Sequence, residues 1–81
     1  MKTLHILRKT SEPIALEAIQ SDPRAAVLLI QDAVLTKGVF PVETYACRED
    51  LDARGIDRSF RPVDYNDIAR LIVEYDRVIT W

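Results

Sequence analysis

The feature that most constrains the fold is an uninterrupted apolar run, AAVLLI, at residues 25–30. A strand that exposes one face to water alternates apolar and polar residues, whereas this run contains no polar residue. The run therefore predicts a strand that is covered on both faces, at the centre of a parallel sheet. It is far shorter than the roughly 18 residues that a membrane-spanning helix needs, so we expect no membrane-spanning segment.

Strand-like and helix-like segments alternate along the rest of the chain. Short apolar or β-branched runs predict further strands at residues 3–8, 42–46, 61–65 and 77–81. Helical periodicity predicts helices at residues 12–20, 48–54 and from 64 onward, with a short helical turn after the central strand. The alternation predicts an α/β fold, with a small Rossmann-like, mostly parallel sheet of four to five strands and helices on both faces. We expect a single domain that spans residues 1–81.

Several residues are expected to set the helix boundaries. Ser11 is expected to cap the first helix, Asp32 the short turn and Asp64 the last helix. Gly38 and Gly55 are expected to end the short turn and the second helix in the left-handed conformation. One side of the first helix is expected to be buried, and it consists of Ile14, Ala15, Ala18 and Ile19.

Composition excludes several kinds of protein. The 81 residues carry 11 Lys and Arg against 13 Asp and Glu, so the chain lacks the basic excess that direct nucleic-acid binding needs. A single cysteine cannot form an internal disulfide, and the first residues lack the pattern of a signal peptide, so we expect a reducing, cytoplasmic location. A domain of this size buries only about 60% of its unfolded surface, which favours oligomerisation.

Common cofactor and metal motifs are missing. The sequence has no GxGxxG, no GxxxxGK[ST] and no CxxC. Its one histidine and one cysteine cannot form a zinc site by themselves. We therefore expect no cofactor and no metal. The histidine, His5, lies within the first strand, where a partly buried, hydrogen-bonded role is expected; the alternative is a general base.

The candidate nucleophile is Cys47, which lies where a strand gives way to a short charged helix. Backbone N–H groups at a helix start favour the thiolate and lower the thiol pKa, and Arg48 would add to this effect. Glu49, Asp50 and Asp52 oppose it, so the expected lowering of the pKa is modest. The alternative is that Cys47 is a buried apolar filler, since free cysteine is among the most buried residue types.

Two further places are candidates for function. Gln31 and Asp32 follow the central strand directly, and ligands of parallel sheets gather at the carboxyl ends of strands. They are therefore expected to line any site that includes Cys47. Trp81 is a large aromatic residue that fits either core closure or a subunit interface, and the sequence leaves both open.

Several segments together resemble the DsrH/TusB family of small sulfur-relay proteins, within the wider DsrE/DsrF-like superfamily. They are TLHILRKT at 3–10, VLLIQDAV at 27–34, YACREDLDARGI at 45–56, VDYNDIARLIVEY at 63–75 and the final ITW. The resemblance covers nearly the whole chain. The combination of these segments is more specific than any one of them.

The resemblance implies a Rossmann-like fold without a cofactor, and assembly into a heterohexamer with DsrE-like (TusD) and DsrF-like (TusC) subunits. It implies a role in passing persulfide sulfur between proteins. In the TusB branch that sulfur serves 2-thiolation of wobble uridine in tRNA, and in the DsrH branch it serves dissimilatory sulfur oxidation. TusB-like subunits resemble structural or docking components, whereas the carrier cysteine of the family is typical of the DsrE-like subunit.

Cys47 matches that carrier position through its spacing to Arg54 and Gly55, although acidic residues follow it where the carrier helix has small apolar ones. Three functions remain open. The chain is a relay subunit, a possible sulfurtransferase component, with Cys47 as the persulfide carrier; or a non-catalytic assembly subunit; or a stand-alone homo-oligomeric relative.

Overall fold

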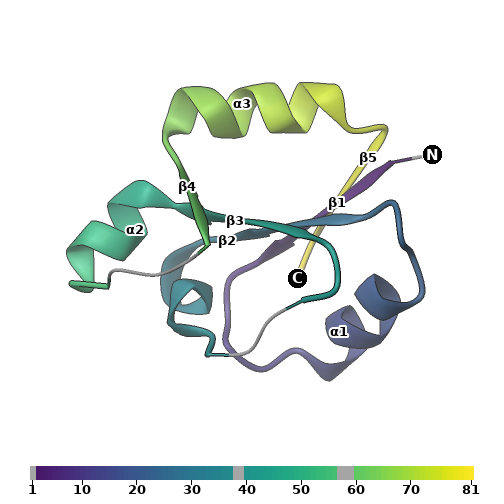
Figure 1. The fold of residues 1–81 in the computed structure, drawn as a ribbon, viewed down its shortest axis with the longest axis horizontal. Coiled ribbons are helices and arrows are strands. Elements are labelled where there is room, and N and C mark those ends of the chain that lie inside the picture. Colours follow the sequence, from purple (N-terminus) through teal and green to yellow (C-terminus); the bar gives the residue numbers. More distant parts are fainter. Residues whose placement is uncertain (1, 38–39, 57–59) are drawn as a thin grey trace.

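The sheet has five strands, all parallel, in the order β4-β3-β2-β1-β5 (Figure 1). The structure is a computed structural model that describes residues 2–37, 40–56 and 60–81. The strands are β1 (Thr3–Leu7), β2 (Ala26–Leu29), β3 (Glu43–Cys47), β4 (Arg61–Val63) and β5 (Arg77–Thr80). The expected mostly parallel sheet is therefore entirely parallel in the described residues.

Helices cover both faces of this sheet. They are α1 (Pro13–Gln20), the 3₁₀ helix η1 (Gln31–Leu35), α2 (Arg48–Ala53) and α3 (Tyr65–Glu74). In Figure 1, α3 crosses one face, whereas α1 and η1 lie on the other. Among the helices of the described ranges, none is long and apolar enough to cross a membrane. The α/β fold expected from the alternating segments is confirmed.

Strand β2 lies at the centre of the sheet, as the AAVLLI run predicts. It pairs with β1 on one side and with β3 on the other, and all four of its residues are buried. Val27 and Leu29 face α1 and η1, whereas Ala26 and Leu28 face α3. A polar residue at any of these four positions would lie in a hydrophobic core, which explains why the run contains none.

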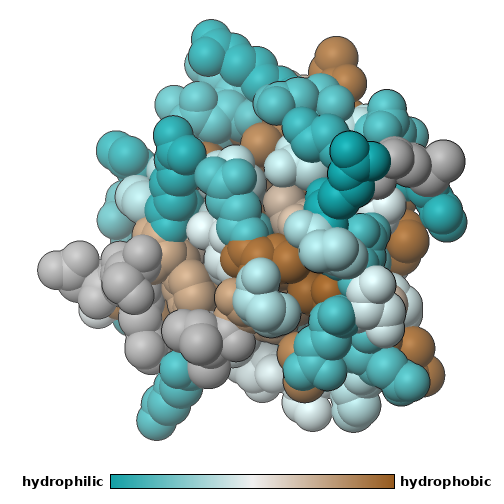
Figure 2. Space-filling model, turned by 45° about the vertical axis from the view of Figure 1, so that its right-hand side comes forward, coloured by the Kyte–Doolittle hydropathy of each residue, from teal (hydrophilic) through white to brown (hydrophobic). Residues whose placement is uncertain are grey.

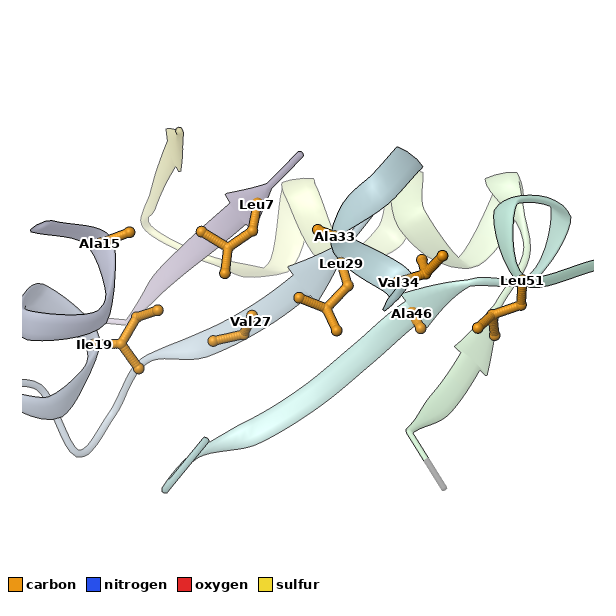
Figure 3. Close-up of a cluster of buried hydrophobic side chains, with 9 residues drawn as sticks. All are labelled: Leu7, Ala15, Ile19, Val27, Leu29, Ala33, Val34, Ala46 and Leu51. Carbon is orange, nitrogen blue, oxygen red and sulfur yellow. The ribbon is translucent and has the colours of Figure 1, made fainter. Parts of the chain in front are cut away.

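The core on the α1 side joins elements from most of the chain. In Figure 3, Ala15 and Ile19 of α1 point toward the side chains of β1 and β2, and Leu51 of α2 closes the other end. Leu51 is the buried residue of α2. The labelled cluster is Leu7, Ala15, Ile19, Val27, Leu29, Ala33, Val34, Ala46 and Leu51.

Two expected helix boundaries are confirmed. Gly55, with φ of 62°, follows α2 in the left-handed conformation that glycine adopts without steric cost. Asp64 caps α3, because its side chain accepts a hydrogen bond from the backbone N–H of Asp67 while the Asp67 carboxylate accepts one from the backbone N–H of Asp64. This reciprocal arrangement is a capping box.

Three expectations about the helices are wrong. Glu12, not Ser11, is the N-cap of α1, because Pro13 at the first helical position forces the residue before it out of the helical region. Asp32 is the second residue of η1 and pairs with Arg54 instead of capping. Ile14 is 70% exposed, because α1 contacts the sheet through Ala15 and Ile19 and the preceding position points away. The expected role of Gly38 lies outside the described residues.

Replacing the buried isoleucine of α1 should cost far more than replacing the exposed one. Ile19→Ala should lower the free energy of unfolding by about 2 to 5 kcal/mol, because Ile19 has no exposed surface. Ile14→Ala on the same helix is the matched control, and it should change the free energy by less than about 0.5 kcal/mol. Urea unfolding measures both values. An equal loss of unfolding free energy in the two variants would contradict the orientation of α1.

Candidate functional site

The candidate site lies at the carboxyl ends of β2 and β3, which are neighbours in the sheet. Leu29 of β2 is paired with Ala46 of β3, so Gln31 and Cys47 both follow this last pair closely. The chain then enters η1 on one side and α2 on the other, and these two helices contact each other. The topology thus brings together the residues that the sequence placed at strand ends.

Asp50 in the first turn of α2 joins the two strand ends. Its Oδ2 accepts a hydrogen bond from the backbone N–H of Gln31 at 2.8 Å. Arg54, one turn later, lies 3.5 Å from Oδ1 of Asp50 and donates through Nη2 to Oδ1 of Asp32 at 2.9 Å. Gln31, Asp32, Asp50 and Arg54 therefore form one network, which we call the η1–α2 clasp.

Gln31 has a strained backbone at this clasp. Its φ is +52°, and it is the one non-glycine residue with positive φ in the described part of the chain. This left-handed conformation costs roughly 1 kcal/mol for a residue with a side chain. The hydrogen bond from its N–H to the charged Asp50 offsets that cost, because bonds to ionised groups are stronger than neutral ones.

Cys47 is the last residue of β3 and has 1% of its surface exposed. Burial is the largest influence on the thiol and raises its pKa; the nearby Asp50 carboxylate also raises it, against opposing backbone N–H groups of Asp50 and Glu49. The modest lowering expected from the helix start is therefore wrong in direction. Desolvation of a buried thiolate exceeds the effect of a helix that is only six residues long.

Arg48 and Trp81 interact with residues other than Cys47. Arg48 is exposed, and its charge assists the backbone N–H of Asp67 in lowering the pKa of Asp64. Trp81 is partly buried against the core on the α1 side, where its indole N–H donates to Nδ1 of His5 at 3.1 Å. The structure therefore gives Trp81 a part in core closure. His5 is hydrogen-bonded as its strand position predicts, and it is fully rather than partly buried.

The sequence reasoning missed the clasp as a unit. From the sequence, Asp50 is expected only to oppose thiolate formation, and Arg54 only to form an Arg-Gly turn. Their spacing of four residues is the signal that pairs an acid with a base on one helix face. No comparable local signal connects Arg54 to Asp32, which lies 22 residues away. In the described residues, no group of three or more His, Cys, Asp or Glu side chains could hold a metal ion.

Comparison with known proteins decides the family. The family model described as "DsrH like protein" matches residues 8–78. The chain belongs to the DsrH-like family. This assignment agrees with the resemblance to the DsrH/TusB family that the sequence segments carry.

Relatives in enteric bacteria support this assignment. The chain is 37% identical to protein TusB of Escherichia coli over 70 residues, covering 68% of this chain and 73% of that protein. It is 44% identical to protein TusB of Salmonella enteritidis over 45 residues, covering 51% of this chain and 47% of that protein. The matched part is therefore about half the length of the Salmonella protein.

A solved structure supports the fold alone. The crystal structure of the ychN protein from E. coli matches with a TM-score of 0.70 over the full length of both chains, at 15% sequence identity. Identity this low carries no information about shared chemistry. The match confirms that the parallel five-stranded arrangement is an established architecture.

Cys47 should react slowly with alkylating reagents in the folded protein. At about pH 8 we expect iodoacetamide to modify it at least about tenfold more slowly than the unfolded chain in urea, because the thiol is buried and its pKa is raised. Asp50→Asn should speed the reaction by removing a charge that raises the pKa. Asp52→Asn on the exposed part of α2 is the control and should leave the rate unchanged. Equal rates in folded and unfolded protein would contradict the sealed thiol.

Removing the side chain of Gln31 should not destabilise the protein. Gln31→Gly should leave the free energy of unfolding unchanged or raise it by up to about 1 kcal/mol, because glycine adopts positive φ without strain. Gln20→Gly, at the end of α1, is the control and should cost about 0.5 to 1 kcal/mol. Thermal or urea unfolding compares the two. A loss in Gln31→Gly as large as that in the control would contradict the left-handed backbone.

Proposed function

We propose that this DsrH-like protein acts as an assembly subunit of a sulfur-relay complex, in which a partner subunit carries the persulfide. The observation that carries this proposal is the state of Cys47. A carrier cysteine must reach a donor and an acceptor as a thiolate, whereas this thiol is buried and its pKa is raised. These properties favour a role as an assembly subunit over a role as a persulfide carrier.

The partners we propose are DsrE-like (TusD) and DsrF-like (TusC) subunits in a heterohexamer, in the cytoplasm. Membership of the DsrH-like family and identity to proteins named TusB support this choice. The sulfur would serve 2-thiolation of tRNA wobble uridine or, in the DsrH branch, sulfur oxidation. The protein would contact RNA only through its partners, since its net charge is −2.

Exposed apolar side chains support an assembling role. Figure 2 shows hydrophobic side chains that reach the surface of one face among hydrophilic ones. On α3, Val73 is 85% exposed, and on α1, across the sheet, Ile14 is 70% exposed. Side chains of this kind are candidates for burial by another subunit.

Charging one of these side chains should weaken assembly without unfolding the chain. We expect Val73→Lys or Ile14→Lys to reduce co-purification of DsrE-like and DsrF-like partners about tenfold or more, because a lysine would be desolvated in an apolar interface. Size-exclusion chromatography of the co-expressed subunits measures the complex, and circular dichroism measures the fold.

Glu17→Lys, an exposed change on α1, controls for added positive charge and should leave the complex intact. Normal complexes with both lysine variants would contradict the proposed use of these surfaces. Self-association of the chain in the absence of partners would instead support a homo-oligomeric relative.

The second candidate function is that Cys47 itself carries sulfur. The favouring observation is its place at the carboxyl end of β3, directly before α2, beside the strained Gln31. In that reaction the Cys47 thiolate attacks the terminal sulfur of a donor persulfide, the donor leaves as a thiolate, and Cys47 becomes the persulfide. The step requires local opening of the structure around Cys47, because the sulfur is buried.

Cys47→Ser separates the two candidates. As an assembly subunit, the variant should support thiolation or sulfur oxidation in cells at the wild-type level, since it keeps the fold and the exposed surfaces. As a carrier, wild-type protein should gain the mass of one sulfur atom from a persulfide donor, and the variant should not. Loss of cellular function with an intact complex would overturn the assembly proposal.

A further inference from the structure

The single tryptophan and the single histidine of the chain are hydrogen-bonded to each other. Nε1 of Trp81 donates a hydrogen bond to Nδ1 of His5 over 3.1 Å. The two rings are close to parallel, with an angle of 17° between them and 6.1 Å between their centres. Two residues 76 positions apart thus join the end of the described chain to its first strand.

This bond determines the protonation state of His5. Indole N–H is only a donor, so Nδ1 must present its lone pair and the proton of the neutral ring must lie on Nε2. Protonation of Nδ1 would place two N–H donors against each other. The bond can therefore exist only with neutral His5.

The surroundings disfavour the cation. His5 is 3% exposed and pairs in the sheet with Val27 of β2 and Ile79 of β5. Burial is the largest influence and lowers the pKa of His5; Asp22, after α1, raises it and Arg77 of β5 lowers it again. Neutral His5 therefore stabilises the fold above its unfolded pKa of roughly 6.5, and this stabilisation is lost as the pH falls through the lower folded pKa.

The His5–Trp81 hydrogen bond joins β1 to the residue that directly follows β5. The strand order reverses between β1 and β5, so these two strands meet at the topological switch point of the sheet. Beyond β5, the backbone N–H of Trp81 donates to the carbonyl of Ile6, and Nε of Arg8 donates to the carbonyl of Trp81. β5 is an edge strand, and β1 is its neighbour in the sheet.

We propose that the His5–Trp81 pair is an acid-sensitive latch: protonation of His5 breaks the bond and releases the Trp81 indole from the core on the α1 side, while the backbone hydrogen bonds of β5 remain. Above pH 6.5 the indole packs against the core on the α1 side. In acid the indole becomes exposed at the switch point, where it is available to a partner surface. This inference does not depend on a role for Cys47 or on the relay assignment.

Fluorescence of the full chain tests the latch, because Trp81 is its only tryptophan. Between about pH 7.5 and pH 5, emission should shift to longer wavelength with a midpoint below about 6.5, while helical circular dichroism stays constant. A red shift that coincides with loss of helix would overturn the latch, because the change would be global. Quenching without a red shift would also overturn it, because the ring would then protonate with the indole still in place.

A variant and a direct measurement complete the test. His5→Gln offers an amide oxygen to the indole and does not titrate, so its emission should not change over this range. An acid shift that persists in His5→Gln would overturn the latch. Should that variant fail to fold, nitrogen NMR of His5 in the unmodified protein decides the question. At about pH 8 we expect the proton on Nε2, and a proton on Nδ1 would overturn the proposal.

Discussion

Burial of β2 on both faces is the constraint on which the rest of the structure depends. Four residues, Ala26–Leu29, contribute to two separate cores, so the sheet needs helices on both sides and β1 and β3 as neighbours. The α1 crossover and α3 supply that cover. Because the strand has no polar face, a shift in its register by one residue would still bury apolar groups, and pairing with β1 and β3 is what sets the register.

The same constraint locates the η1–α2 clasp. A strand buried on both faces must leave the core abruptly, and the chain does so at Gln31 through a left-handed backbone. The exposed N–H of that turn needs a partner, and Asp50 supplies it from the neighbouring strand end. The clasp is thus a structural response to the way β2 ends. A cluster of polar side chains at a strand end can therefore have a structural role without a catalytic one.

The sequence predicted the fold more completely than the site. The AAVLLI run, the Asp64 cap and Gly55 each signal local structure through one or two residues, and each prediction is confirmed. The predicted cap at Ser11 is wrong because Pro13 sets the start of α1. The predicted burial of Ile14 is wrong because the packing of α1 on the sheet decides which side of the helix is buried. Contacts between distant segments, such as Arg54 with Asp32 or Trp81 with His5, have no local signal and needed the folded chain.

The behaviour of Cys47 shows why position alone does not make a nucleophile. A helix start stabilises an adjacent anion by about 0.3 to 1 kcal/mol, which is less than one unit of pKa. Burial of a charged group shifts its pKa by up to several units in the opposite sense. The thiol lies at the start of α2 and is also sealed, so the larger effect prevails. A carrier cysteine at this corner would need the same strand end with the thiol exposed and without the nearby Asp50 carboxylate, since burial and that carboxylate both raise the pKa of the Cys47 thiol.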